Sequence, residues 1–229
     1  MSSFAKRFYK EVTVAARDGG FIVLLDGRVL KTPKKQPLVM VKEAHAKLVA
    51  AEWDAQVDEI NPGLMPCTRL MNVACEQTPA RRDDLIAEAR RYASTDLLCY
   101  RAASPSDLTA RQEEKWNPLL EWAGQLGIKL KSVTGIIAVE QDKDALDAVA
   151  DQARALGDVD LTLLVHFISV CGSAVLGLAV MKKHLTAAQA LELSCLDELY
   201  QIEQWGEDEE AAERTEFIRR ETLALSELI

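Results

Sequence analysis

Histidine is scarce in this sequence, and the patterns of several common active sites are missing. None of its three histidines has another histidine or a cysteine three or four residues further on, which argues against a metal site. No G-x-G-x-x-G or G-x-S-x-G occurs. Gly172 and Gly177 have the spacing of a phosphate-binding loop, but Leu178 and Ala179 stand where that loop needs lysine and serine or threonine. We therefore expect no cofactor, no metal and no catalytic residue.

Cysteine pairs and targeting segments are also missing. The five cysteines are odd in number, widely spaced and without a C-x-x-C, which favours buried reduced thiols; they are Cys67, Cys75, Cys99, Cys171 and Cys195. The first twelve residues lack the apolar core of a secretory signal. Both observations lead us to expect a cytoplasmic protein.

Charge is unevenly distributed along the chain. The formal net charge is −9, and residues 192–216 alone hold ten acidic residues and one arginine, whereas residues 1–42 hold nine basic residues and three acidic ones. The acidic total argues against nucleic acid as a partner, and the basic N-terminal part lacks the interleaved aromatics of a base-stacking surface. A solvated face is the simplest interpretation of both regions.

One stretch, residues 160–183, carries no formal charge between Asp160 and Lys182 and is long enough to span a bilayer. Five small or polar residues recur along it at steps of three and four, which places them on one helical stripe: Thr162, His166, Ser169, Ser173 and Gly177. A single helix surrounded by lipid has no neighbouring helix that such a stripe of polar residues could contact. We therefore favour a buried central helix and no stable membrane insertion, with a true span or an interfacial segment as the alternatives.

The N-terminal part has the alternation and turns of a small sheet. Asp18-Gly19-Gly20 and Asp26-Gly27 separate apolar runs and predict hairpins. The expected strands are Val12–Ala16, Phe21–Leu25, Arg28–Lys31 and Leu38–Val41. From residue 42 a stripe of Ala44, Leu48, Ala51 and Ala55 predicts one helix packed on that sheet.

Beyond Asn61-Pro62-Gly63 the pattern is almost wholly helical, so we place a domain boundary there, between residues 1–62 and 63–229. Thr78-Pro79 and Asn117-Pro118 resemble helix starts, and the second predicts two helices or a kink within residues 106–126. Further helices are expected over residues 142–156, 186–206 and 209–229, with Thr186 and Gln189 forming a capping box. The fold class is α+β, a β-meander with one packed helix followed by a mainly α-helical domain.

The helix predicted over residues 186–206 carries two apolar stripes. The first consists of Ala188, Leu191, Cys195, Leu199 and Ile202, and the second consists of Leu193, Leu196 and Tyr200. Either both stripes are buried inside the protein or one of them awaits a partner. Glu198, at the edge of the first stripe, is expected to have a specific partner because an unpaired carboxylate there is costly.

Four segments, in this order and spacing, resemble a known family. They are Ala51–Gln56 (AEWDAQ), Thr95–Arg101 (TDLLCYR), Trp116–Trp122 (WNPLLEW) and Tyr200–Gly206 (YQIEQWG). In these residues the chain resembles the assembly chaperones of the ATP synthase catalytic head (the F-one sector), and it looks like a bacterial member. The resemblance implies a non-enzymatic chaperone that binds the free alpha subunit until the beta subunit replaces it. It also implies a β-rich N-terminal domain and a helical C-terminal one.

With the resemblance and the stripes together, we predict eight partner-binding residues: Trp53, Asp54, Leu196, Glu198, Tyr200, Glu203, Trp205 and Glu207. For Trp53 the preferred role is packing at the junction of the two domains, and direct contact with the partner is the alternative. Two competing functions stay open, a small-molecule enzyme that uses Cys99 or His166 and a generic protein-interaction adaptor.

Overall fold

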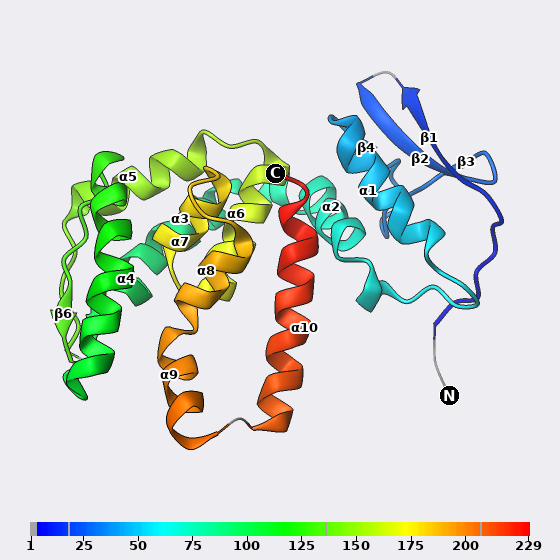
Figure 1. Ribbon diagram of the computed structural model, residues 1–229. Coiled ribbons are helices and arrows are strands. Elements are labelled where there is room, and N and C mark those ends of the chain that lie inside the picture. Colours follow the sequence, from blue (N-terminus) through cyan, green and yellow to red (C-terminus); the bar gives the residue numbers. More distant parts are fainter. Residues whose placement is uncertain (1–3, 18, 136, 207) are drawn as a thin grey trace. The chain divides into compact units, whose positions relative to one another are not determined.

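The computed structural model describes residues 4–17, 19–135, 137–206 and 208–229, and the chain forms two compact units (Figure 1). The first unit consists of residues up to 80 together with 227–229, and the second consists of residues 81–226. Of the positions singled out above, Asp18 and Glu207 lie outside the described residues.

The first unit contains the predicted sheet. Its strands are β1 (Val12–Arg17), β2 (Gly20–Leu25), β3 (Arg28–Val29) and β4 (Val39–Met40). Strand β2 pairs antiparallel with β1 along one edge and with both β3 and β4 along its other edge. The β2–β3 turn has Asp26 at φ 47° and Gly27 at φ 75°, the left-handed conformation that the Asp-Gly pair predicts.

Helix α1 (Glu43–Asp54) packs on β1 and β2, but with a different face from the one predicted. His45, Ala46 and Val49 are buried, whereas Ala44 and Ala51 of the predicted stripe are exposed. Both sets of residues have helical spacing. The set with the larger side chains, which continues to Trp53, covers the sheet because it removes more apolar area from water.

A carboxylate joins the next helix to α1. After a short 3-10 helix, η1 (Pro62–Leu64), the first turn of α2 (Pro66–Glu76) donates the N–H groups of Cys67 and Thr68 to Glu52, both at 2.7 Å. Helix α2 therefore lies in the same unit as the sheet, and the units divide between residues 80 and 81 rather than after residue 62.

Helix α3 (Thr78–Ser94), most of which belongs to the second unit, has non-helical dihedrals at Arg81, and its Ile86, Ala89 and Ala93 are buried. It is followed by η2 (Leu97–Cys99), β5 (Tyr100–Arg101), α4 (Ser106–Gln125), β6 (Val133–Thr134) and α5 (Lys143–Arg154). Strands β5 and β6 pair in parallel. The first alternative expected at Asn117-Pro118, two separate helices, is wrong, because α4 runs through Pro118 as one helix; Trp116 and Leu119 on either side of it are buried.

The charge-free stretch forms two helices rather than the single central helix predicted. Helix α6 (Asp158–Cys171) ends at Gly172, which has φ 62°, and α7 (Ala174–Met181) begins after Ser173, whose hydroxyl accepts the N–H of Leu176. A Cβ at Gly177 would lie 2.6 Å from Ile168 Cγ1, so the two helices can pack closely only with glycine there. The α6–α7 pair contacts α4, α5, α8 and α10 and is buried as predicted. Among the described residues, no helix is long and apolar enough to cross a membrane.

A buried carboxylate fixes the α6–α7 turn. Asp96 is fully buried and accepts hydrogen bonds from the Ser173 hydroxyl at 2.7 Å and from the N–H groups of Leu98 and Val175 at 3.0 and 3.1 Å. Burial raises the pKa of Asp96 to about 6, although these donors act in the opposite direction. Asp96 belongs to Thr95–Arg101, the second of the four segments that resemble the family. This segment therefore stabilises the core of the second unit.

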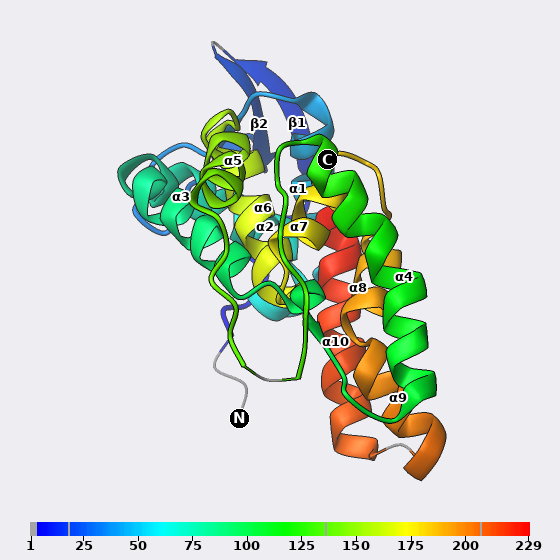
Figure 2. The same cartoon turned by 90° about the vertical axis from the view of Figure 1, so that its left-hand side faces the viewer.

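The chain ends in three helices, α8 (Ala187–Ser194), α9 (Leu196–Trp205) and α10 (Glu209–Ser226). The predicted capping box of Thr186 and Gln189 starts α8, but the single helix expected as far as Gly206 is interrupted at Cys195. Helix α8 contacts α6, α7 and α10, whereas α9 contacts α4 and α8. Figures 1 and 2 show α9 and the first half of α10 extending together beyond the α6–α7 pair.

Candidate functional site

Among the helices of the second unit, the large apolar side chains that are exposed lie on α9 and α10. On α9, Leu199 is 41% exposed, Ile202 38% and Trp205 79%, and on α10 Phe217 is 43% exposed. Scattered apolar residues are normal on a surface, but four large ones on two neighbouring helices are typical of an interaction surface.

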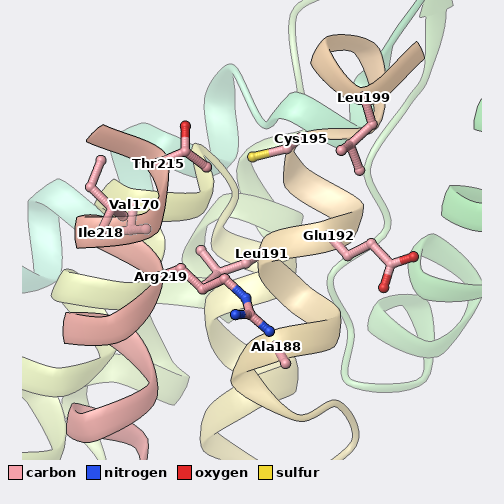
Figure 3. A pocket seen from close by; sticks show the side chains of 9 residues that line it. All are labelled: Val170, Ala188, Leu191, Glu192, Cys195, Leu199, Thr215, Ile218 and Arg219. Carbon is pink, nitrogen blue, oxygen red and sulfur yellow. The ribbon is translucent and has the colours of Figure 1, made fainter. Parts of the chain in front are cut away.

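A groove lies between α8 and α10 beside these residues, with a volume of about 350 Å³. Six of its nine lining residues are apolar: Val170, Ala188, Leu191, Cys195, Leu199 and Ile218. Glu192, Thr215 and Arg219 supply the polar part of the lining, and Figure 3 shows the groove between the α8 and α10 ribbons. We call this feature the α8–α10 groove.

The first apolar stripe thus faces the α8–α10 groove, and complete internal burial of both stripes is wrong. Four of its residues, Ala188, Leu191, Cys195 and Leu199, line the groove, and Leu199 and Ile202 are exposed. The second stripe faces α4: Tyr200 is buried, and Leu193 and Leu196 are half-buried. The stripe available to a partner is therefore the first one.

Polar contacts hold the inner face of α9 and the end of α8 against α4. Tyr200 donates to Asp107 at 2.9 Å, and Arg111 lies over the Tyr200 ring and donates to Glu203 at 2.7 Å. The Tyr200 hydrogen bond lowers the pKa of Asp107 and raises that of Tyr200. Further along α4, the Trp116 indole donates to the Leu193 carbonyl at 3.0 Å. These contacts keep the outer face of α9 open, because the helix cannot rotate to bury it.

A second, smaller hollow of about 160 Å³ lies on the α4 side of α9. Leu196, Leu199 and Glu203 contribute to it from α9, and Arg111 and Lys115 from α4. Leu199 and Glu192 line both this hollow and the α8–α10 groove, so these two residues form the ridge between them.

The structure places the predicted site residues in two separate units. Leu196, Glu198, Tyr200, Glu203 and Trp205 all lie on α9, whereas Trp53 and Asp54 lie at the end of α1 in the first unit. The partner expected for Glu198 within the chain is not found among the described residues. Its side chain is exposed, so the desolvation cost that motivated the expectation does not arise.

In the first unit, Trp53 packs on the Tyr9 ring with the centroids 5.6 Å apart, and Tyr9 donates to the Trp53 carbonyl at 2.7 Å. Asp54 pairs with Arg7 at 3.4 Å. The position of Trp53 at the junction of the two domains stays a prediction. Within its own unit the ring lines a pocket, which is described below.

The sequence missed the residues that α10 and α6 add to the groove, namely Thr215, Ile218, Arg219 and Val170. Phe217 was also missed. Charged residues along the last helix made the apolar side that includes Ile218 difficult to recognise, although the aromatic Phe217 in that helix was a usable signal.

The thiol considered for catalysis, that of Cys99, is poorly suited to act as a nucleophile. Cys99 is buried, and burial raises the pKa of its thiol to about 12, which suppresses the thiolate that a nucleophile needs. His166 packs edge-on against Phe167 with the ring centroids 5.7 Å apart. Within the described ranges, no group of three or more histidine, cysteine or carboxylate side chains could hold a metal ion.

Comparison with known proteins identifies the family. The profile of the ATP12 chaperone protein family matches residues 6–124. The protein atp12, mitochondrial, of Schizosaccharomyces pombe is 28% identical over 221 residues, which cover 91% of this chain and 76% of that protein.

Two solved structures share the fold. Atp12 from Paracoccus denitrificans has a TM-score of 0.92 and 38% identity, covering 97% of this chain and 96% of its own. A protein from Agrobacterium tumefaciens described as a candidate chaperone has a TM-score of 0.92 and 42% identity, covering 97% of this chain and 85% of its own. The chain therefore belongs to the ATP12 chaperone protein family and, as its four sequence segments indicated, is an assembly chaperone of ATP synthase.

Proposed function

We propose that the protein binds the free alpha subunit of the ATP synthase catalytic head, prevents its aggregation and releases it to the beta subunit. The observation that carries this proposal is the open apolar surface formed by the α8–α10 groove with Leu199, Ile202 and Trp205. A ring subunit without its neighbours exposes an apolar interface, and a chaperone has to cover that interface while remaining displaceable.

The polar residues around the groove favour a reversible complex. Glu192 and Arg219 line the groove, Glu198 is exposed on α9, and Glu203 lines the smaller hollow on the α4 side of α9. Charged side chains at the rim of an interface contribute more to the rate of encounter than to final affinity. A client that meets this surface would be captured quickly and held by a modest apolar area, so the beta subunit can displace the chaperone.

Binding is proposed to be passive and non-enzymatic. The sequence has no nucleotide-binding motif, and the buried Cys99 is unsuited to nucleophilic catalysis. The cytoplasm is the compartment in which we expect the complex to form. Fractionation of cells that express a tagged chain would test that location.

Co-purification tests the choice of client. The alpha subunit is expressed alone, with and without this protein, and the soluble complex is isolated through a tag on the chaperone. We expect a stable complex with the alpha subunit, no such complex with the beta subunit, and release of the alpha subunit when the beta subunit is added.

Light scattering tests passive holding. Isolated alpha subunit is diluted from denaturant with or without the chaperone, in the absence of ATP. Suppression of scattering is expected at a near-stoichiometric ratio. A requirement for ATP hydrolysis by this chain would contradict passive holding, and equal suppression for an unrelated aggregating protein would favour the generic adaptor.

A further inference from the structure

The first unit has a pocket of its own, more open than the α8–α10 groove, with a volume of about 600 Å³. The lining is mainly apolar, formed by Phe8, Leu25, Val29, Leu30 and Trp53. All of these residues belong to the N-terminal segment, the β2–β3 hairpin and α1, so the pocket is complete within this unit. We call it the Trp53 pocket.

The aromatic part of the pocket is held in place but incompletely covered. The Trp53 ring is fixed by Tyr9, whereas Phe8, which packs edge-on against Tyr9 at 5.2 Å, is 67% exposed. The Trp53 indole N–H is buried, and the described part of the chain offers it no acceptor. An exposed phenylalanine in the lining of a mainly apolar pocket is expected where a bound chain completes that pocket.

Two cations complete the lining of the Trp53 pocket. Arg28 and Lys31 are exposed, and their side chains form no ion pair with a described residue. Arg28 contributes to the lowered pKa of Asp26, but the main causes are the hydrogen bonds that Asp26 accepts from the N–H groups of Glu11 and Lys10. Both cations therefore remain available to a negatively charged ligand.

Apolar walls with two available cations define the occupant. We infer that the Trp53 pocket binds an extended peptide segment in which a large apolar side chain lies next to one or two carboxylates. The apolar side chain packs on Trp53 and Phe8, and the carboxylates pair with Arg28 and Lys31. Only one part of the inference rests on the proposed function, namely that this peptide segment belongs to the client, the alpha subunit.

The two surfaces would then select different parts of a client. The pocket carries cations within a segment, residues 1–42, that has six more basic than acidic residues, whereas the α8–α10 groove borders the acidic residues 192–216. Two weak sites on one chain raise the overall affinity for a client that presents both an acidic and a basic apolar segment.

The test uses the full chain and short peptides as probes. A blocked peptide with the core Gly-Phe-Asp-Glu-Gly is titrated into ¹⁵N-labelled protein, and the indole N–H resonances are followed by NMR. Loss of one resonance in Trp53→Phe identifies that of Trp53. We expect this resonance to shift in a saturable manner, those of Trp116, Trp122 and Trp205 to stay in place, and the charge-reversed core Gly-Phe-Lys-Lys-Gly to have no effect.

Charge reversal supplies the matched control. Arg28→Glu with Lys31→Glu should weaken peptide binding by about tenfold or more. Arg17→Glu with Lys42→Glu makes the same charge change at exposed positions of the same unit that do not line the pocket, and should change binding by less than about twofold. Circular dichroism confirms that both variants fold.

Several results would overturn the inference. They are an unmoved Trp53 resonance, equal binding of the acidic and basic peptides, and equal effects of the two double variants. Tight binding of decanoate with no binding of the peptide would identify a site for small apolar carboxylates instead. If the peptides do not bind but the alpha subunit co-purifies, the pocket inference is wrong and the proposed function stands. If the peptides bind but the alpha subunit does not co-purify, the proposed client is wrong and the pocket inference stands.

Discussion

The α6–α7 pair and the α9–α10 segment are both rich in apolar residues, but they differ in what covers them. In α6 and α7, Leu163, Phe167 and Leu176 are fully buried by surrounding helices. In α9 and α10, Leu199, Trp205 and Phe217 remain exposed, although the helices carrying them are held to the core by specific contacts. The difference shows which apolar residues stabilise the fold and which are available for binding.

The largest expected effect comes from making the same substitution in both regions. Phe167→Ala removes a fully buried ring and should lower the free energy of unfolding by about 3–5 kcal/mol. Phe217→Ala removes a ring that is 43% exposed and should cost less than about 1 kcal/mol. Urea unfolding followed by circular dichroism measures both. Similar losses would show that α10 packs as tightly as the core.

The next effect concerns the buried carboxyl at the α6–α7 turn. The pKa of Asp96 is raised from 3.8 to about 6, so the folded state binds its proton more tightly than the unfolded state does. Its contribution is therefore fully present below pH 4 and is lost as the pH rises through 6, with a full span on the order of 3 kcal/mol.

Stability measured at pH 4 and at pH 6.5 tests this sign. Asp96→Asn lowers stability at both values because it replaces an acceptor of three donors, but it removes the Asp96 contribution to the difference between them. If the variant keeps the whole pH dependence of the natural protein, other groups cause it and the raised pKa is wrong.

The smallest effect on stability is expected at the exposed acids of α9. Glu203→Lys breaks the exposed pair with Arg111 and should change stability by less than about 1 kcal/mol. It also places a cation beside Arg111 and Lys115, so we expect slower capture of the client, with a loss that shrinks above about 0.15 M salt, where the Debye length is about 8 Å.

Glu209→Lys makes the same charge change at the start of α10 and serves as the comparison. Association rates at two salt concentrations decide between the variants. If both variants lose the same association rate at both salt concentrations, the acidic residues form a solvated face and do not steer the client.

The sheet and the helical character of the chain could be predicted because local signals agree there with the tertiary structure. Asp26-Gly27 forms the predicted turn, and Thr186 with Gln189 forms the predicted capping box. The break at Gly172 could not be predicted, because apolar residues continue on both sides and the deciding contact joins Ser173 to Asp96, 77 residues away from it. On α1 two stripes fit the helical period equally well, and only the sheet determines which one is buried.

The candidate site was partly predictable for a similar reason. The two stripes on residues 186–206 were visible in the sequence, and the fourth family segment marked α9. Which stripe faces outward depends on Asp107 and Arg111, whose partners on α9 are 93 and 92 residues away. Helical periodicity identifies the faces of a helix, but it does not say which face its neighbours cover.

The most direct test of the account is the effect of one added charge on the outer face of α9. Leu199→Glu places a carboxylate on the ridge between the two hollows, and Gln201→Glu adds the same charge at an exposed position of the same helix that lines neither. Titration of each folded variant against the alpha subunit should show affinity reduced by about tenfold or more for Leu199→Glu, because a charge is desolvated in an apolar contact, and by less than about twofold for Gln201→Glu. Unchanged affinity for Leu199→Glu would show that the client binds elsewhere and would contradict the central claim.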